Sequence, residues 1–370
     1  MASFGILCGL LALTACASPS ADPAAPVEDV ALADAGDTSV DDADDAGALD
    51  AAPDVALDSA DADSDAPDAP RVEDATPDAP RVEDATPDAD PPLVIDPTWH
   101  DPDVFQVGTF NIDWLMDEYG GDFTPRNRTD FRHVASLVRA IDVEVLALQE
   151  IDGEGALDRL NLPPVWDRVV GRSGWSQNPA VLVRTDRARI LSSREVRLPS
   201  NEFPSKDPLV VEVERLSDGA VYWIVVLHLH PFTDLEAVEA RRTQAEEVAE
   251  WLATATDDAG VPVLDRAIVV GDLNDTHDGI SRHGPAAGAL LDHPALTVAS
   301  DACDGGTTLG YESRIDHVLL GAAPAAAWTS AGETCAIVRH DDLSPWSDYE
   351  GGWRARSNIS SHRPIFVTLD

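Results

Sequence analysis

Short apolar runs separated by polar and turn-forming segments recur along the chain from Asp103 to its end. Several of these runs alternate apolar and polar positions, a pattern typical of strands, whereas others are continuously apolar, as in buried strands. The runs that predict strands are Val104–Phe110, Val143–Leu148, Ala180–Arg184, Leu209–Arg215, Val221–Leu227, Ala267–Val270, Ile315–Leu320 and Ile365–Leu369.

Two segments have helical periodicity instead. Apolar residues recur at helical spacing at Phe131, Val134, Leu137, Val138 and Ile141. A second helix is expected to begin at Thr233-Asp234-Leu235-Glu236, which has the form of a capping box. Its apolar stripe comprises Leu235, Val238, Ala245, Val248 and Leu252. Because strands and helices interleave without strict alternation, the pattern favours an α/β fold of two packed sheets with helices outside, over one doubly wound parallel sheet.

The first 100 residues differ from the rest in charge and composition. The chain has 25 Lys+Arg and 68 Asp+Glu, a formal charge of -43. Residues 1–100 hold 24 of the acids, with Arg71 and Arg81 as their only bases, and so contribute -22, while the other 270 residues contribute -21. With Phe4 and Trp99 as its only aromatic residues, this segment cannot bury enough apolar surface to offset the entropy of ordering.

Residues 16–98 are rich in Ala, Asp and Pro and contain a tandem decapeptide at 68–77 and 78–87. A polar repeat with proline has no face to pack, so we interpret the segment as a disordered tether, with a span on the order of 50 Å. Calcium binding by its carboxylates is an alternative, although no EF-hand or RTX pattern is present. Residues 99–370 are long enough for one domain with a sizeable core.

The N-terminus has the features of an export signal. Phe4–Leu13 is apolar and too short to span a bilayer, and Leu13-Thr14-Ala15-Cys16 follows it directly. This tetrad resembles a bacterial lipobox, which predicts a signal peptide over residues 1–15 and a lipidated Cys16 that anchors the protein to the cell envelope or surface. No Lys or Arg precedes the apolar run, so either the start lies upstream or the signal is weak. An ordinary cleaved secretory signal is the alternative.

Cys303 and Cys335 are the two cysteines of the domain. Such a pair is consistent with one disulfide in an oxidising compartment, which the chain-entropy account values at about 3–4 kcal/mol. Two unpaired core thiols are the alternative.

Acids, amides and histidines follow or precede the apolar runs in six short strings. They are Thr109–Leu115, Leu146–Glu150, Val226–Leu229, Val269–Asp275, Arg314–Val318 and Ser360–Pro364. Loops at the rim of a sheet are where scaffolds present chemistry, and hard oxygen ligands suit Mg²⁺, Mn²⁺ or Ca²⁺ rather than zinc. Taken singly, such strings are more often plain turn chemistry, a satisfied core pair or a solvated strand end than catalytic.

Together and in this order, the strings resemble the endonuclease/exonuclease/phosphatase superfamily over about residues 103–370. The resemblance implies a two-sheet αββα sandwich and a metal-dependent phosphoesterase. It implies that Asn111 and Glu150 hold the divalent cation, with Asp113 as a further metal-side acid. The implied catalytic residues are His228, Asp272, Asn274, Asp316 and His362, and Arg241, Arg242 and Gln244 match an element that we interpret as mainly structural. The chain departs from the family at Ser361, where the family has Asp; Asp341 and Asp342 in the preceding loop are possible substitutes.

The resemblance implies direct attack of water on a phosphate ester. Asp272, held by Asn274, is expected to orient and deprotonate the water, while His362, made more basic by Asp316, and His228 donate charge-assisted hydrogen bonds to the phosphoryl group. We expect Mg²⁺ as the cofactor, a monomer, and membrane contact through the lipid anchor alone.

The substrate is the least specified part of the prediction. Extracellular nucleic acid is favoured over a phospholipid headgroup or a small phosphate ester, and a non-catalytic surface module is the alternative from another class. The charge of -21 on residues 101–370 and the single lysine, Lys206, argue against a protein that holds polyanions by bulk charge.

Overall fold

The computed structural model describes residues 104–116, 128–200, 206–281, 283–309, 312–340 and 359–370. The predicted signal peptide, Cys16 and the tether lie outside these residues, as do Asp341 and Asp342. Within the described residues, no helix is both long and apolar enough to pass through a bilayer.

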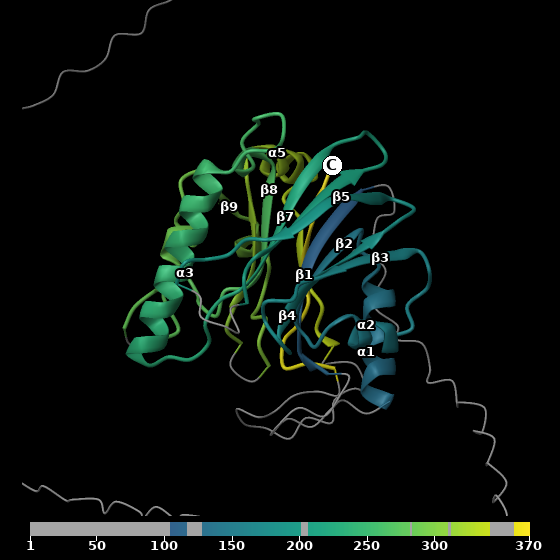
Figure 1. Ribbon diagram of the computed structural model, residues 1–370, viewed down its shortest axis with the longest axis horizontal. Helices are drawn as coiled ribbons and strands as arrows, with labels where there is room; N and C mark the ends of the chain where they lie inside the picture. Colours follow the sequence, from purple (N-terminus) through teal and green to yellow (C-terminus); the bar gives the residue numbers. More distant parts are fainter. Residues whose placement is uncertain (1–103, 117–127, 201–205, 282, 310–311, 341–358) are drawn as a thin grey trace, which may run out of the picture. The chain divides into compact units, whose positions relative to one another are not determined.

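Two mixed β-sheets pack against each other and carry helices on their outer faces, which confirms the predicted two-sheet α/β sandwich (Figure 1). In the described chain, the strands are β1 (Phe105–Leu115), β2 (Val145–Ile151), β3 (Trp166–Val170), β4 (Asn178–Arg184), β5 (Ala188–Glu195), β6 (Leu209–Arg215), β7 (Val221–His228), β8 (Ala267–Asp272), β9 (Thr297–Val298), β10 (Asp316–Leu320), β11 (Cys335–Ile337) and β12 (Ile365–Leu369). The α-helices are α1 (Arg128–Ile141), α2 (Glu154–Arg159), α3 (Leu235–Thr254), α4 (Gly288–Leu291) and α5 (Ala322–Ser330).

The order of the strands brings several strand ends to one rim. The first sheet has the order β11-β12-β1-β2-β4-β3 and the second has β5-β6-β7-β8-β10-β9. The pairs β1–β2 and β7–β8 are parallel, so their carboxyl ends lie together, while β10 and β12 run antiparallel to β8 and β1 and start at that same rim. The loops at this rim therefore come from segments far apart in the sequence.

Apolar residues fill three layers of the sandwich. Residues such as Val107, Val226 and Val270 form the layer between the two sheets. The outer face of the first sheet packs on α1 through residues such as Leu137. The outer face of the second sheet packs on α3 through residues such as Val248. This arrangement buries the continuous apolar strands on both faces, as their sequences require.

Helix α3 begins one residue later than a Thr233 cap would place it. Its N-cap is Asp234, whose carboxylate accepts a hydrogen bond from the backbone N–H of Ala237 at 3.0 Å, so the expected capping box is wrong. Leu235 was expected in the buried stripe but is 55% exposed, because it lies in the first turn, outside the contact of α3 with the second sheet. The other four stripe residues are buried as predicted.

Among the described strands, the four that the apolar pattern does not predict all lie at sheet edges. Strands β3 and β5 are edge strands whose side chains are largely half-buried or exposed. Strands β9 and β11, also at edges, have two and three residues. Such strands carry little of the apolar alternation on which sequence prediction depends.

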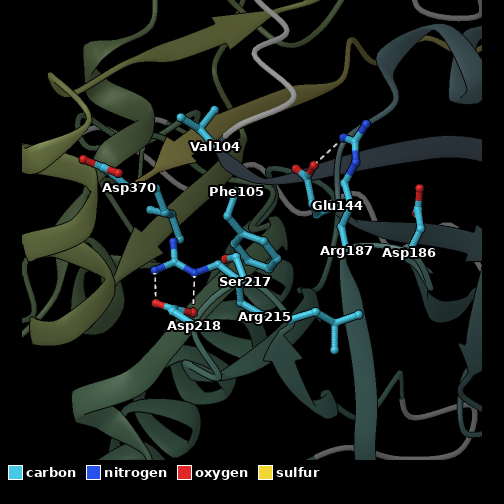
Figure 2. Close-up of a pocket in the computed structure, with 11 residues that line it drawn as sticks. Val104, Phe105, Glu144, Asp186, Arg187, Arg215, Ser217, Asp218 and Asp370 are labelled. Carbon is cyan, nitrogen blue, oxygen red and sulfur yellow. Dashed lines mark hydrogen bonds and ion pairs between the residues drawn. The ribbon is translucent and has the colours of Figure 1, made fainter.

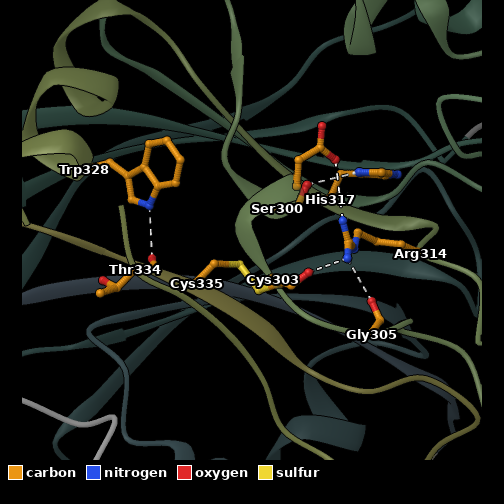
Figure 3. The surroundings of a disulfide bond; sticks show 9 residues. Ser300, Cys303, Gly305, Arg314, His317, Trp328, Thr334 and Cys335 are labelled. Atoms are coloured by element: carbon orange, nitrogen blue, oxygen red, sulfur yellow. Dashed lines mark hydrogen bonds and ion pairs between the residues drawn. A yellow bond between two sulfur atoms is a disulfide. The ribbon is translucent and has the colours of Figure 1, made fainter. Parts of the chain in front are cut away.

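A disulfide links Cys303, which follows the second sheet's β9, to Cys335, the first residue of β11 in the first sheet (Figure 3). The surrounding backbone is also held by side chains: Trp328 donates its indole N–H to the carbonyl of Thr334 at 3.0 Å, and Arg314 donates to the carbonyl of Cys303. The disulfide therefore connects the edges of the two sheets across 32 residues of sequence.

Candidate active site

The carboxyl ends of β1 and β2 place an amide beside a carboxylate. Asn111 on β1 pairs in register with Gln149 on β2, so Glu150 follows immediately next to it. The side-chain amide of Asn111 donates to Glu150 Oε1 at 3.2 Å and to Asp272 Oδ2 at 3.0 Å. Because Asp272 belongs to the second sheet, Asn111 joins the two sheets at the rim. Its side-chain oxygen accepts the backbone N–H of Asp113 at 2.9 Å.

Glu150 lies between groups of both charges. The backbone N–H of Trp114 donates to Glu150 Oε2 at 3.1 Å. Burial, followed by the nearby Asp113 carboxylate, raises the pKa of Glu150, while the positive charges of Lys206 and His362 oppose the rise. A cation near the oxygens of this buried carboxylate would stabilise its charged form.

Three neighbouring strands of the second sheet line up a histidine and two aspartates. In register, His228 on β7 lies opposite Asp272 on β8, and Asp316 on β10 lies opposite the same Asp272. All three side chains are buried. His228 Nε2 lies 3.7 Å from Glu150 Oε1 and 3.9 Å from Asp272 Oδ2, so the histidine faces both carboxylates.

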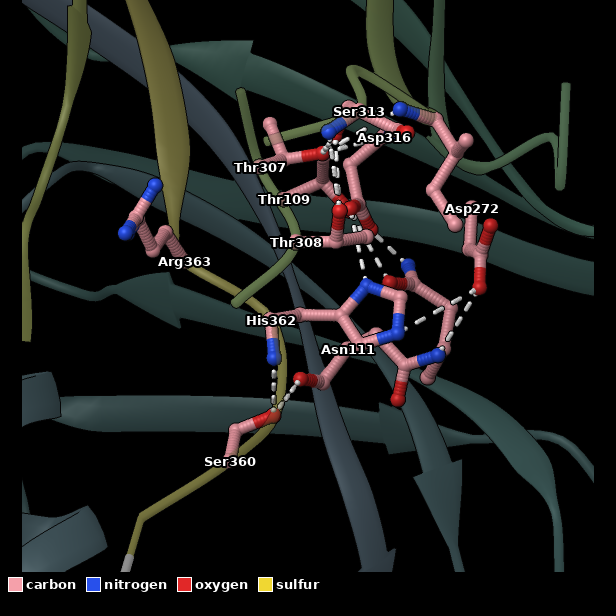
Figure 4. Close-up of polar contacts among 12 residues, drawn as sticks. Thr109, Asn111, Asp272, Thr307, Thr308, Ser313, Asp316, Ser360, His362 and Arg363 are labelled. Carbon is pink, nitrogen blue, oxygen red and sulfur yellow. Dashed lines mark hydrogen bonds and ion pairs between the residues drawn. The ribbon is translucent and has the colours of Figure 1, made fainter. Parts of the chain in front are cut away.

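His362 completes the group from the segment before β12. Its Nδ1 lies 2.8 Å from Asp316 Oδ2 and its Nε2 lies 4.0 Å from Asp272 Oδ2, so the ring stands between the two aspartates (Figure 4). Ser360 orients this segment: its hydroxyl donates to the carbonyl of Asn111 at 2.7 Å and accepts the backbone N–H of His362 at 3.0 Å. The sequence motif contained Ser360, but nothing in it predicted this link to β1.

Asn274 supports Asp272 through its backbone rather than its side chain. The backbone N–H of Asn274 donates to Asp272 Oδ1 at 2.8 Å, while its side-chain amide donates to the carbonyl of Leu229 at 3.0 Å. Asn274 adopts a left-handed φ of 50°, which lets the chain turn back over the carboxylate. The residue thus connects the loops that follow β7 and β8.

Burial and neighbouring charges shift the pKa values of Asp272 and His362 by different amounts. Burial, followed by the Asp316 carboxylate, raises the pKa of Asp272 to about 7. Burial opposes protonation of His362, but the carboxylates of Asp316, Asp272 and Glu150 outweigh it and raise its pKa to about 10. Asp272, which titrates near neutral pH, is suited to act as a general base, and His362, charged at neutral pH, is suited to stabilise negative charge.

His228 is the one histidine of this group whose surroundings oppose a positive charge on the ring. Burial, together with the positive charges of Lys206 and His362, lowers its pKa well below the ordinary value. This favours the neutral ring near pH 7. As a neutral ring it can still donate from one nitrogen.

The Arg241–Gln244 element of α3 holds the loop after β7. The guanidinium of Arg241, fully buried, donates to the carbonyls of His230 at 2.7 Å and Phe232 at 3.0 Å. The side-chain oxygen of Gln244 accepts the backbone N–H of His230 at 2.8 Å. Arg242 instead pairs with Glu239 one turn away on α3. These contacts fit the structural role expected for the element.

Ser361 and Lys206 are two further residues that the sequence analysis named without giving them a role in the site. At Ser361, where the family motif has Asp, the backbone carbonyl accepts the N–H of Leu309 at 2.9 Å. The charge of Lys206 interacts with those of Glu150 and Asp272. The sequence offers one reason to notice this residue, which is that it is the single lysine of the chain.

A pocket of about 420 Å³ lies at the opposite end of the sandwich (Figure 2). It is lined by Phe105 at the start of β1, whereas Asn111 lies six residues further along, roughly 20 Å away at the rise of a strand. Ion pairs of Arg187 with Glu144 and of Arg215 with Asp218 stand in its wall. It is therefore separate from the rim that carries the candidate catalytic side chains.

Comparison with known proteins places this geometry in a family. Residues 108–360 match the Endonuclease/Exonuclease/phosphatase family. No curated protein matches the chain in sequence. Among solved structures, a mannosyl-6-phosphatase from Bacteroides thetaiotaomicron VPI-5482 is 19% identical, with 72% of this chain and 100% of that chain covered and a TM-score of 0.50. A functionally unknown conserved protein from Enterococcus faecalis V583 is 12% identical, with 72% and 99% covered and a TM-score of 0.51.

At these identities the solved structures show that the fold is shared. The family itself is shown by the match over residues 108–360, which cover most of the domain. The chain belongs to the Endonuclease/Exonuclease/phosphatase family, whose members are phosphoesterase hydrolases.

Proposed function

We propose that this protein is a divalent-metal-dependent phosphoesterase that hydrolyses its substrate by direct, in-line attack of water. One observation carries the proposal: an Asp316–His362 ion pair lies next to Asp272, a carboxyl that titrates near pH 7, and both face the Asn111–Glu150 pair across the rim. The residues come from both sheets, and their common position at strand ends is typical of a catalytic site.

The donor atoms at the rim fit a hard divalent cation. Asn111, Asp113 and Glu150 offer amide and carboxylate oxygens, the ligands that Mg²⁺, Mn²⁺ and Ca²⁺ prefer. Asp272, Asp316 and His362 also offer atoms within 4.8 Å of one another. Because His362 is protonated and its Nδ1 binds Asp316, we assign the ion to Glu150 and Asn111, with Asp113 close by. When bound, the ion would neutralise charge on a phosphate oxygen.

The protein's own side chains account for the remaining steps. Asp272, near its pKa at neutral pH and held by the backbone of Asn274, would orient a water and take its proton. His362, held as an imidazolium by Asp316, would donate a charge-assisted hydrogen bond to a phosphoryl oxygen from Nε2. The neutral His228 would donate a second hydrogen bond to the phosphoryl group.

A pair of variants tests catalysis and metal binding together. Glu150→Ala and His362→Ala should each lower kcat/KM at least about 100-fold, the usual cost of losing one electrostatic stabiliser. Mg²⁺ should raise the Tm of the parent and not that of Glu150→Ala. Glu154→Ala removes an exposed acid four residues away and should change neither value. If both variants equal the parent on every phosphodiester tested with Mg²⁺, Mn²⁺ and Ca²⁺, catalysis at this site is wrong, and a parent without activity would favour a non-catalytic surface module.

For the substrate we propose a phosphodiester of extracellular nucleic acid, with a phospholipid headgroup or small phosphate ester as the second candidate. The second candidate is favoured by one observation, the charge of -21 on residues 101–370, which repels polyanions. A panel of plasmid DNA, RNA, sphingomyelin, inositol phosphates and bis-p-nitrophenyl phosphate separates the two. Cleavage of lipid with nucleic acid left intact would reverse the order.

We further propose that the protein is exported and anchored through a lipid on Cys16, with residues 16–98 as the tether. The support is the apolar run ending in Leu-Thr-Ala-Cys. Metabolic labelling with palmitate should mark the parent and be lost in Cys16→Ala. An unlabelled parent would leave secretion without an anchor as the explanation.

A further inference from the structure

The Gly305–Leu309 segment lies beside both members of the Asp316–His362 ion pair, although none of its residues belongs to the six strings that predicted the site. The segment follows the disulfide-bonded Cys303 and precedes β10. Thr307, at its centre, is fully buried. Figure 4 shows that this residue is joined to the chain at Asp316 and lies near His362.

The hydroxyl of Thr307 accepts backbone hydrogen bonds at the start of β10. The N–H groups of Ile315 and Asp316 each lie 3.2 Å from its Oγ1. A buried backbone N–H that loses its acceptor is destabilising, so the native turn keeps this contact. The hydroxyl therefore restrains the main chain from which the Asp316 carboxylate projects into the site.

The backbone of Thr307 holds the other member of the pair. Its carbonyl accepts the N–H of Arg363 at 2.7 Å, and Arg363 directly follows His362. The next residue, Thr308, forms an isolated antiparallel bridge with His362. Thr307 thus binds the main chain at Asp316, in the second sheet, and next to His362, which leads into the first.

The main chain at Thr307 is itself closely packed. The preceding Gly306 has no room for a side chain, because a Cβ built on it would lie 2.1 Å from the carbonyl carbon of Glu312. The buried guanidinium of Arg363 donates to the Gly306 carbonyl at 3.0 Å and pairs with the Glu312 carboxylate at 2.7 Å. These contacts do not involve the Thr307 hydroxyl, so they remain when the hydroxyl is removed.

The Asp316–His362 contact is sensitive to the placement of either residue. His362 Nδ1 and Asp316 Oδ2 lie 2.8 Å apart, and a hydrogen bond weakens steeply when its angle departs from linearity. The other ring nitrogen, Nε2, lies 4.0 Å from Asp272 Oδ2. A shift of the Asp316 carboxylate would therefore turn the ring whose Nε2 is assigned to the phosphoryl group.

We propose that Thr307 is a positioning residue of the active site, which fixes the geometry of the Asp316–His362 pair by binding the main chain at both of its members. The inference rests on the proposed function, because this pair is the one assigned to stabilising charge on the phosphoryl group. Thr307 acts through these two side chains and does not itself contact the substrate.

The first test is NMR of the full chain and requires no turnover. A proton on His362 Nδ1 that is bound to a carboxylate gives a signal far downfield, and His362→Ala assigns the signal by abolishing it. Thr307→Val keeps the branched shape without the hydroxyl, so the signal should move upfield or disappear through exchange with water. Thr307→Ser keeps the hydroxyl and should restore it. A parental signal in Thr307→Val would overturn the proposal, as would a parent that lacks the signal even at low temperature.

Thr308→Val is the matched control. The Thr308 hydroxyl donates to the carbonyl of Ser313 at 3.1 Å and accepts the N–H of the same residue at 3.0 Å. The substitution therefore removes hydrogen bonds from the same segment while the bond from Asp316 to Thr307 remains. The Nδ1–H signal should equal that of the parent, even if the Tm falls. An equal change of the signal in Thr308→Val and Thr307→Val would show a general effect of the segment and refute the role of Thr307.

The second test is kinetic, with bis-p-nitrophenyl phosphate as the probe. Thr307→Val should lower kcat and kcat/KM by the same factor, about 10- to 100-fold, and leave KM unchanged, because misplacing the pair removes an interaction made in the transition state. Thr307→Ser should recover most of this loss, and Thr308→Val should behave as the parent. A change confined to KM would contradict a positioning role.

The outcomes separate the two proposals. A parent that hydrolyses no phosphate ester refutes the proposed function, and the NMR signal then still decides whether Thr307 holds the pair. Parental kcat in Thr307→Val refutes the role of Thr307 while leaving the phosphoesterase intact. If Thr307→Val fails to fold, Thr307→Ala removes the hydroxyl without the bulk of valine, and a parental signal in that variant refutes the proposal.

Discussion

His362 Nδ1 lies 2.8 Å from Asp316 Oδ2, although 46 residues separate the two along the chain. Asp316 opens β10 of the second sheet, and His362 precedes β12 of the first. The contact therefore exists only because the two sheets pack with these strand ends at one rim. Burial alone would lower the pKa of the His362 ring, but Asp316, together with Asp272 and Glu150, outweighs burial and raises that pKa from 6.5 to about 10, which keeps the ring a cation at neutral pH.

Removing the Asp316 charge should remove that cation. Asp316→Asn is expected to lower the pKa of His362 and to reduce kcat/KM about 100- to 1000-fold, because the imidazolium no longer stabilises the phosphoryl group at neutral pH. Titration of the His362 ring by NMR, together with steady-state kinetics, checks both effects. Asp292→Asn, which removes a largely exposed acid, is the control and should change neither.

The same pair should make stability depend on alkaline pH. The folded pKa of His362, about 10, lies above its ordinary value of 6.5, so the stabilisation is complete below about pH 6.5 and is lost as pH rises through about 10. Denaturant unfolding at pH 6.5, 8.5 and 10 should show a decline in the parent that is smaller in Asp316→Asn. Parallel declines in the two proteins would contradict the assignment.

Asp272 should destabilise the metal-free protein when it ionises. Its folded pKa is about 7 against 3.8 for an exposed aspartate, so its favourable contribution is present below about pH 4 and is lost as pH rises through about 7. Asp272→Asn should therefore raise the Tm measured in EDTA more at pH 8 than at pH 5, while abolishing hydrolysis. An equal change in Tm at both pH values would show that burial does not perturb this carboxyl.

Gly271 should tolerate no side chain. Its φ is 139°, and a Cβ built on it would lie 2.0 Å from the carbonyl oxygen of Leu227 on the adjacent strand. Gly271→Ala should lower the free energy of unfolding by more than about 3 kcal/mol and displace Asp272. Gly260→Ala is the matched control, since Gly260 also has a positive φ but nothing within 4 Å; it should cost about 1 kcal/mol.

Reduction of the Cys303–Cys335 disulfide should destabilise the domain. For a separation of 32 residues, the chain-entropy account gives about 3–4 kcal/mol. Urea unfolding with and without dithiothreitol measures the difference. The double variant Cys303→Ala/Cys335→Ala should be insensitive to the reductant and as stable as the reduced parent, because no cross-link then restricts its unfolded state.

Local sequence patterns predicted every described strand at the centre of the two sheets. Central strands such as β1, β2, β7 and β8 are buried on both faces, so their apolar runs are long and distinct. The edge strands β3 and β5 were missed because partly exposed residues carry a weak pattern. The cap of α3 was misplaced by one residue, since Thr233 and Asp234 are both good N-cap residues and only the backbone geometry chooses between them.

The residue types at strand ends, and their order along the chain, were determined by the sequence alone. They established the fold class and the family, because each short string reflects local chemistry that is present in the chain itself. Only the tertiary structure decided the protonation states, the lowered pKa of His228, the role of Ser360 as a link to Asn111 and the charge interactions of Lys206. These properties depend on burial and on distances through space between residues such as Asn111 and Asp272, 161 positions apart, which no local pattern contains.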